Sequence, residues 1–117
     1  MSADQSSYMP FAISVVRDRD EVAVVPVGEL DLGTADKVGQ EVGQVQAGGF
    51  ARIVVDLRQV DFIDSTALRM LLSLRNDAKR NGYALMLVPP GPAARRIFEL
   101  TGTRGLFDWR IDHAEPY

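Results

Sequence analysis

The hydrophobic pattern near the start of the chain predicts two neighbouring strands. Two apolar runs, Phe11 to Val16 and Val22 to Val27, are separated by five consecutive charged residues. Short apolar runs of this kind, rich in β-branched residues and joined by a polar connection, are typical of a hairpin. Pro26 cannot donate a hydrogen bond to a neighbouring strand, so we expect it near an edge or an irregularity of the second strand.

The next segment predicts a loop and a short helix. Gly28 to Gly33 is expected to leave the second strand as a loop, and Thr34 to cap the helix that follows. Gly39 and Gly43 each cost roughly 1 kcal/mol relative to alanine inside a helix, so this helix depends on packing. The two glycines either permit close contact with another helix or mark a marginal surface helix. Its buried side is expected to consist of Ala35, Val38, Val42 and Val45.

The centre of the chain predicts a buried strand followed by a longer helix. The run Ile53 to Leu57 indicates the strand, and a short apolar patch from Val60 to Ile63 precedes a polar turn at Asp64. Asp64 or Ser65 occupies the position of an N-cap, and the helix extends to about Arg80. A turn from strand to helix lies at the carboxyl edge of a sheet, where open α/β folds usually bind their ligands. The inward face is expected to contain Ala67, Leu71, Leu74 and Ala78, and the outward face Arg69, Ser73, Asn76 and Arg80.

The remaining pattern completes a fold of alternating elements. It predicts a strand from Tyr83 to Val88, a helix starting at Pro92 with Ala94, Ile97 and Phe98 inward, and a last strand from Leu106 to Ile111. The order ββαβαβαβ indicates a single α/β domain with a mixed, mostly parallel sheet of about five strands covered by helices. We expect residues 1–9 to be a flexible segment, residues 10–112 the domain and residues 113–117 a tail.

Composition and charge narrow the possible functions. The 117 residues carry a formal net charge of −3 with a pI near 5.0, which gives no basic field for nucleic acid. The chain has no cysteine, no apolar run near the ~20 residues that span a bilayer, and no recognisable signal peptide. We therefore expect a cytoplasmic protein that binds neither nucleic acid nor membrane. The one histidine, His113, excludes histidine-based triads and the common zinc sites.

The carboxylates provide little support for catalysis. Asp56, Asp61 and Asp64 fit a magnesium site or a phosphoryl-accepting aspartate, but solvated carboxylates in turns are the favoured interpretation. Glu29 and Asp31 resemble a catalytic pair only in composition, because a spacing of two on a loop fixes no separation. A small enzyme that uses Asp61 and Asp64 with a divalent metal stays a minor alternative. We expect no cofactor and no resident metal.

Ser65 has two interpretations from the residues alone. Its hydroxyl either caps the helix, contributing ~1 kcal/mol, or accepts a phosphate from another enzyme. A phosphate adds about −1.5 to −2 charges and is tolerated at a helix N-terminus. Beside Asp64, and near Glu29 and Asp31, that charge would disturb any partner docked over this edge. Capping is favoured on these grounds alone.

Three segments resemble the STAS domains of bacterial anti-sigma factor antagonists. The first runs from Val54 through Val60-Asp61-Phe62-Ile63-Asp64-Ser65-Thr66-Ala67-Leu68. The others are Gly28-Glu29-Leu30-Asp31, and Phe98-Glu99-Leu100-Thr101-Gly102 followed by Leu106-Phe107. They occur in the family's order, and the resemblance spans about Phe11 to Asp112.

The resemblance implies a switch at one serine. In this family the phosphoacceptor is the serine directly after the aspartate. That serine is Ser65 here, and Thr66 is the fallback acceptor. Unphosphorylated members bind and sequester an anti-sigma factor that is an ATP-binding serine kinase with a histidine-kinase-like fold. Phosphorylation by that kinase ends the binding, and a PP2C-type phosphatase restores it. Ala67 replaces the usual glycine and adds a methyl group at the turn that the kinase must approach.

The expected partner surface follows the carboxyl edge and the exposed face of the central helix. The alternative is an adaptor or structural STAS module of a transporter or a stress-signalling complex, in which Ser65 only caps a helix. The residues after Ile111 are too few and too interrupted by proline for the closing helix of many members, so we expect part of one sheet face or partner surface to be absent. The expected contact residues are Glu29, Asp31, Thr34, Asp64, Thr66, Ala67, Arg69, Ser73 and Asn76.

Overall fold

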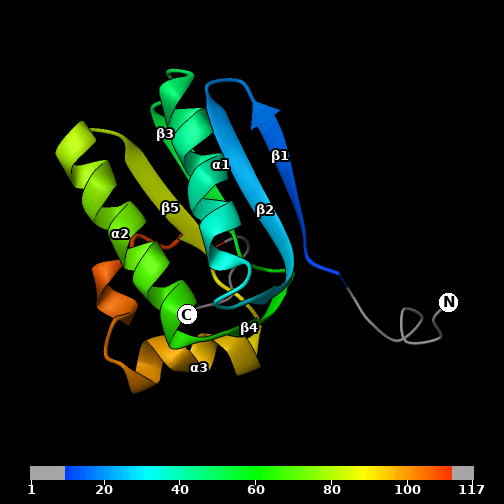
Figure 1. The fold of residues 1–117 in the computed structure, drawn as a ribbon. Coiled ribbons are helices and arrows are strands. Elements are labelled where there is room, and N and C mark those ends of the chain that lie inside the picture. The colour runs from blue at the N-terminus through cyan, green and yellow to red at the C-terminus, as the bar shows by residue number, and fades with distance from the viewer. Residues whose placement is uncertain (1–9, 112–117) are drawn as a thin grey trace, which may run out of the picture.

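The computed structural model describes residues 10–111, and Figure 1 shows their arrangement. The predicted flexible segment 1–9, the tail 113–117 with His113, and Asp112 lie outside the described residues. Within residues 10–111, no helix is long and apolar enough to cross a bilayer.

The sheet is mixed and mostly parallel, as predicted. Strand β1 (Ala12–Asp18) forms an antiparallel hairpin with β2 (Glu21–Leu30). β2 pairs in parallel with β3 (Arg52–Asp56), and β3 with β5 (Ala84–Val88). A fifth strand, β4 (Val60–Ile63), pairs in parallel with the far end of β2, giving the order β1-β2-β3-β5 with β4 beside β2.

The irregularity expected near Pro26 is present in β2. This strand pairs with β3 as far as Val24 and with β4 from Gly28 onward, so its neighbour changes around Pro26. The register shifts between Gly28 and Glu29, and Gly28 has a φ of +113°, a conformation that favours glycine. The change of neighbour provides β4 with a place in the sheet.

Two predicted boundaries are wrong near this junction. Residues Gly28 to Leu30 belong to β2, and the loop begins only at Asp31, because β4 supplies pairing partners for the end of β2. β4 itself was not predicted as a strand, because only Val60 and Ile63 of its four residues are buried. A pattern of two apolar positions separated by two exposed ones matches neither strand alternation nor helix spacing.

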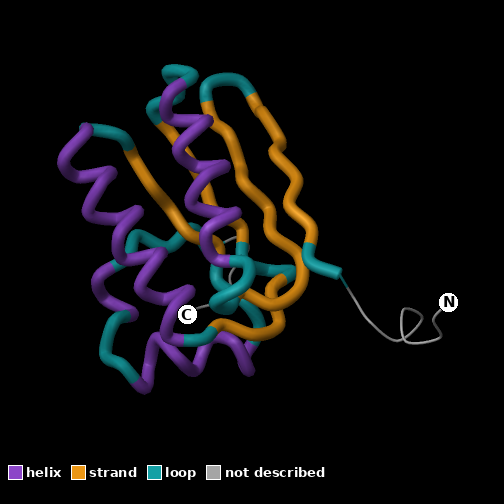
Figure 2. The backbone as a smooth tube through the Cα atoms, in the orientation of Figure 1, coloured by secondary structure: helices purple, strands orange, loops and turns teal. Residues whose placement is uncertain are grey.

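The last predicted strand, Leu106 to Ile111, is also wrong. A short 3-10 helix covers Arg104–Leu106, and only Trp109 forms a single bridge, to Leu87 of β5. Figure 2 draws this stretch as helix and loop. Phe107 and Trp109 instead pack edge-to-face on Phe98, with ring centroids 5.7 and 5.1 Å from that of Phe98. The alternate spacing of Phe107 and Trp109 therefore reflects packing on Phe98 and not a strand. The order of elements along the chain is ββαββαβα.

Two helices lie side by side over one face of the sheet (Figure 1). They are α1 (Ala35–Ala47) and α2 (Ser65–Asn81), and Gly82 ends α2 in the left-handed conformation at φ +73°. Gly39 of α1 faces α2, because a Cβ placed there would lie 3.8 Å from Met70 Cγ, whereas Gly43 meets nothing within 4 Å. The predicted inward residues of α1, namely Ala35, Val38, Val42 and Val45, are all buried.

The third helix, α3 (Pro92–Leu100), crosses the end of the sheet beside β4 (Figure 1). Ala94 and Phe98 are buried and Ile97 is partly buried, in agreement with the predicted inward face. After α3, Arg110 donates to both carboxylate oxygens of Glu21 at 2.6 Å, and its backbone N–H donates to Leu87. The side-chain hydrogen bonds from Arg110, together with the charges of Arg110 and Arg52, outweigh the effect of burial and lower the pKa of Glu21.

Tyr83 contributes to the stability of the fold, and this contribution is lost at strongly alkaline pH. Its side chain is buried and its hydroxyl donates to Asp77 Oδ2 at 3.2 Å. Burial, followed by the neighbouring Asp77 carboxylate, raises the pKa of Tyr83 from 10.0 to about 12. The unfolded chain releases this proton near pH 10 while the folded protein retains it. The contribution is therefore complete below pH 10 and is lost as the pH rises toward 12.

We predict that Tyr83→Phe flattens this alkaline decline. The free energy of unfolding of the wild type, from urea titrations, should fall between pH 10 and 12 by about 2 kcal/mol more than that of the variant. At neutral pH the variant loses only the hydrogen bond to Asp77, which costs about 1 kcal/mol. Parallel pH curves for the two proteins would contradict the role of Tyr83.

Candidate functional site

The site begins at the turn between β4 and α2, where Asp64 is the N-cap. Its backbone is extended, with φ −99° and ψ −178°, and its Oδ1 accepts a hydrogen bond from the Ala67 N–H at 2.9 Å. Its carbonyl oxygen accepts the Leu68 N–H at 3.0 Å. Of the two cap candidates in the sequence, the structure therefore selects Asp64.

Ser65 is the first residue of α2 and its side chain is exposed. Its hydroxyl forms no hydrogen bond with any residue between 10 and 111. The interpretation of Ser65 as the helix cap is therefore wrong, because Asp64 already satisfies the amide that a cap would serve. Thr66, the next hydroxyl, is half-buried. Ser65 presents the more accessible oxygen of the two.

The loop after β2 is joined directly to this turn. The Asp64 N–H donates to the carbonyl oxygen of Leu30 at 3.1 Å, and Glu29 pairs with Phe62 across the two strands. The carboxyl ends of β2 and β4 therefore meet beside the first turn of α2 (Figure 1). The structure brings the Gly28-Glu29-Leu30-Asp31 segment and Ser65 to one edge, as the sequence predicted.

Inside that loop, Thr34 and Asp31 bond to their neighbours. The Thr34 hydroxyl donates to the Glu29 carbonyl oxygen at 2.7 Å and accepts the Asp31 N–H at 3.0 Å. Asp31 Oδ1 accepts the Gly33 N–H at 3.0 Å. Thr34 stands at the N-cap position of α1, but its side chain makes no capping hydrogen bond. The two side chains therefore fix the shape of the loop.

Negative charge is concentrated at this edge, without forming a metal site. Glu29 and Asp61 are exposed and Asp64 is half-buried. Among the residues that the structure describes, no group of three potential ligands could hold a metal ion. The magnesium interpretation of Asp56, Asp61 and Asp64 has no geometric support within that part of the chain.

Asp56 is not a solvated turn carboxylate, contrary to expectation. It is 8% exposed and receives hydrogen bonds from the Arg58 side chain, the shortest 2.7 Å long, and from the Arg58 N–H. Burial raises the pKa of Asp56, but the hydrogen bonds and the charge of Arg58 together hold it below the usual value. Asp56 is thus a buried ion-pair partner in the fold.

The outer face of α2 continues the exposed surface from Ser65. Arg69, Ser73 and Asn76 are all exposed and follow Ser65 at helical spacing, so they form one stripe. Ala67 differs from expectation, because its side chain is fully buried under this turn. A methyl group that points into the core cannot contact a partner, so Ala67 does not belong to the expected surface.

Two apolar residues at this edge were missed by sequence reasoning. Leu32 is 77% exposed in the loop after β2, and Phe62 is 47% exposed in β4. The available signal was their position, because Leu32 lies between Asp31 and Gly33, and Phe62 lies one residue after Asp61 and two before Asp64. Large apolar side chains that lie among polar residues and stay exposed indicate a binding surface when they occur together.

A comparison with protein families decides the identity of this domain. The family model for the STAS domain matches residues 12–115, which is most of the chain. The chain belongs to the STAS domain family.

Similar proteins of this family have a consistent description. The STAS domain is 33% identical over 94 residues to the anti-sigma-B factor antagonist of Listeria monocytogenes, covering 79% of this chain and 81% of that protein. It is 33% identical over 95 residues to the anti-sigma-F factor antagonist RsfB of Mycobacterium tuberculosis, covering 80% and 77%. A crystal structure of an anti-sigma factor antagonist from Mycobacterium paratuberculosis matches with a TM-score of 0.77 and 28% identity, covering 90% and 88%.

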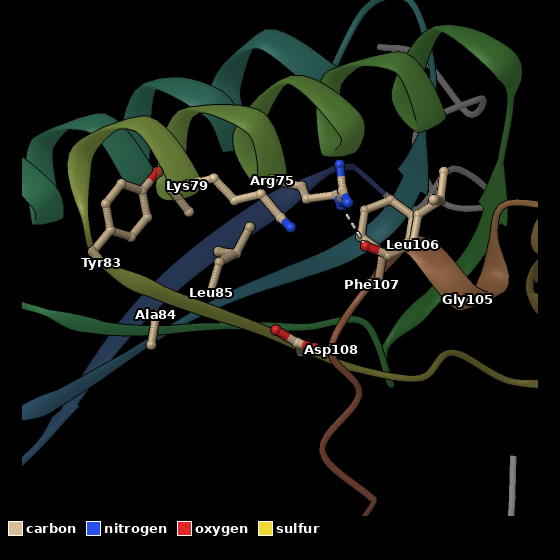
Figure 3. A pocket seen from close by; sticks show the side chains of 10 residues that line it. Arg75, Lys79, Tyr83, Ala84, Leu85, Gly105, Leu106, Phe107 and Asp108 are labelled. Atoms are coloured by element: carbon tan, nitrogen blue, oxygen red, sulfur yellow. Dashed lines mark hydrogen bonds between the residues drawn. The ribbon is translucent and has the colours of Figure 1, made fainter.

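A surface pocket of about 220 Å³ lies elsewhere on the STAS domain (Figure 3). Arg75 and Lys79 reach over it from α2, Leu85 of β5 forms part of its wall, and Asp108 lies opposite. Arg75 Nε donates to the carbonyl oxygen of Leu106 and so ties α2 to the segment after α3. Arg75 follows Ser65 by ten residues, roughly 15 Å along a helix, so this pocket is separate from the edge of the sheet that carries Ser65.

We predict that Asp64→Ala destabilises the fold more than Asp64→Asn. Alanine leaves the Ala67 N–H without its cap and should lower the free energy of unfolding by about 1 kcal/mol, whereas asparagine retains a capping oxygen. Urea unfolding of the three proteins at neutral pH measures the difference. Equal stability of the alanine and asparagine variants would show that the cap contributes nothing.

Proposed function

We propose that this STAS domain is an anti-sigma factor antagonist that is controlled by phosphorylation of Ser65. The observation that carries the proposal is an exposed serine hydroxyl without a hydrogen-bond partner among residues 10–111, at the start of α2. The names of its relatives support the same function. A hydroxyl that the fold does not use is available to a kinase.

The proposed partner is an ATP-binding anti-sigma serine kinase with a histidine-kinase-like fold. The unphosphorylated domain binds and sequesters it in the cytoplasm, and a PP2C-type phosphatase later removes the phosphate. The domain acts as the substrate of the kinase and not as a catalyst.

The fold can accept a phosphate at Ser65 without unfolding. The side chain is exposed, so the dianion stays hydrated, and the unpaired backbone N–H groups of the first helical turn favour negative charge. The Ala67 methyl group is buried beneath the turn and does not obstruct a kinase from outside. Phosphorylation should therefore act on the docked complex and leave the structure of the free protein unchanged.

The added charge opposes docking for two reasons. A kinase that phosphorylates Ser65 must hold the terminal phosphate of its nucleotide close to that hydroxyl, so phosphoserine would face a second polyanion. Asp64 is adjacent, and Glu29 and Asp61 lie at the same edge, so these carboxylates add to the negative charge of a phosphate at Ser65. Arg69 and the stripe through Ser73 and Asn76 would complete the contact along α2.

We predict that an ATP-binding anti-sigma kinase from the source organism phosphorylates the full chain at Ser65. Mass spectrometry after incubation with ATP should locate one phosphate there, and Ser65→Ala should abolish it. The matched control is Thr66→Val, which removes the fallback acceptor and should be modified like the wild type. Phosphate that persists in Ser65→Ala and disappears in Thr66→Val would move the site to Thr66. An adaptor STAS module would show no modification and would co-purify with a larger assembly.

We also predict that Ser65→Asp weakens kinase binding at least about tenfold, whereas Ser65→Ala keeps wild-type affinity. Isothermal titration with the kinase in ADP measures both dissociation constants. Ser14→Asp is the control, because it makes the same substitution at an exposed position of β1, outside the expected contact residues. If both aspartate variants bind equally well, the position of the charge at Ser65 has no special effect and the charge mechanism is wrong.

A further inference from the structure

The edge formed by the loop after β2 and the turn at Asp64 and Ser65 carries two large apolar side chains that are exposed to solvent. We call it the switch edge. Leu32 exposes 77% of its surface and Phe62 exposes 47%. Neither belongs to the buried core, although β2 supplies Leu30 to it and β4 supplies Ile63. An isolated exposed leucine needs no explanation, but two such residues beside one exposed serine do.

The loop holds Leu32 in a fixed, outward position. Hydrogen bonds of Thr34 to Glu29 and Asp31, and of Asp31 to Gly33, close the loop on both sides of Leu32. The base of the loop is tied to the turn before Ser65 through the Leu30 carbonyl and the Asp64 N–H. A side chain presented by a preformed loop costs little conformational entropy when a partner binds it.

Phe62 reaches the same edge from β4. It lies three residues before Ser65 and pairs with Glu29, whose carbonyl oxygen accepts the Thr34 hydroxyl. Leu32 lies two residues beyond Leu30, at most about 7 Å along an extended chain. The two apolar residues therefore flank the loop–helix junction that presents Ser65.

We propose that Leu32, together with Phe62, is the apolar anchor that selects the partner kinase at the Ser65 edge. This inference rests on the proposed function and specifies what the partner must offer. Glu29 pairs with Phe62, and Asp61 and Asp64 lie within two residues of Phe62, so the partner surface should be an apolar pocket bordered by Lys or Arg. The carboxylates speed the encounter, and the anchor sets how long the complex lasts.

Val16 is an exposed apolar residue that lies away from this edge. Val16, which is 53% exposed, pairs with Ala23 in the hairpin, and Ala23 pairs with Val54 of β3. This position lies toward the amino end of β2, whereas Ser65 follows the carboxyl end of β4, which pairs with the carboxyl end of β2. Val16 is therefore a matched control of similar exposure far from the switch.

The test uses the full chain in its unphosphorylated form and a purified anti-sigma kinase, in ADP, that phosphorylates wild-type Ser65. Surface plasmon resonance of Leu32→Ala should show a dissociation constant raised by about tenfold or more, mostly through faster dissociation. Leu32→Met, which keeps an apolar side chain of similar size, should stay within about threefold of the wild type. Phe62→Ala should weaken binding in the same direction, and Val16→Ala should leave it unchanged. Matching thermal unfolding of the Leu32 and Val16 variants confirms that both are folded.

The result separates this inference from the function on which it rests. If Leu32→Ala and Val16→Ala bind alike while the wild type is still phosphorylated at Ser65, the anchor is wrong and the proposed function stands. If no ATP-binding anti-sigma kinase of the source organism binds or modifies the wild type, the proposed function fails and the anchor fails with it. A loss confined to Leu32→Ala and Phe62→Ala, with recovery in Leu32→Met, supports the anchor.

Discussion

The site depends on one hydrogen bond, from the Ala67 N–H to the carboxylate of Asp64. A helix start leaves several backbone N–H groups unpaired, and a neighbouring polar side chain usually satisfies one of them. If Ser65 performed that role, its oxygen would be held against the backbone and hidden from a kinase. Because Asp64 caps α2, Ser65 occupies the first helical position with its side chain outward. Asp64 thus provides the helix cap, and the Ser65 hydroxyl stays accessible to the proposed kinase.

The position of this turn depends on the change of neighbour along β2. Near Pro26 the strand leaves β3, and the bulge at Gly28 allows its last residues to pair with β4. That short pairing places the end of β4 beside the loop that follows β2. The hydrogen bond from the Asp64 N–H to the Leu30 carbonyl oxygen joins the turn after β4 to the end of β2. Segments more than thirty residues apart therefore present one continuous surface, although each is short and irregular alone.

The same edge combines two kinds of recognition that act differently. Its carboxylates are hydrated and give charge complementarity over a distance, which affects how fast a basic partner arrives. Exposed Leu32 and Phe62 offer apolar area that is released from water only when a complementary surface covers it. A phosphate at Ser65 would add charge amid these groups, where the carboxylates already present cannot balance it. In the proposed mechanism, phosphorylation of Ser65 therefore alters docking without requiring movement of the helices.

The sequence by itself determined the helices, the hairpin and the parallel pairing of β3 with β5, because their apolar residues repeat at the spacing of each element. It also located the turn at Asp64 and Ser65, since polar residues there interrupt two apolar patterns. Only the tertiary structure decided which of the two caps the helix, that Ala67 is buried, that β4 is a strand and that the segment from Leu106 is not. Those features depend on contacts between distant segments, such as β4 with β2 and Phe107 with Phe98, which local spacing does not record.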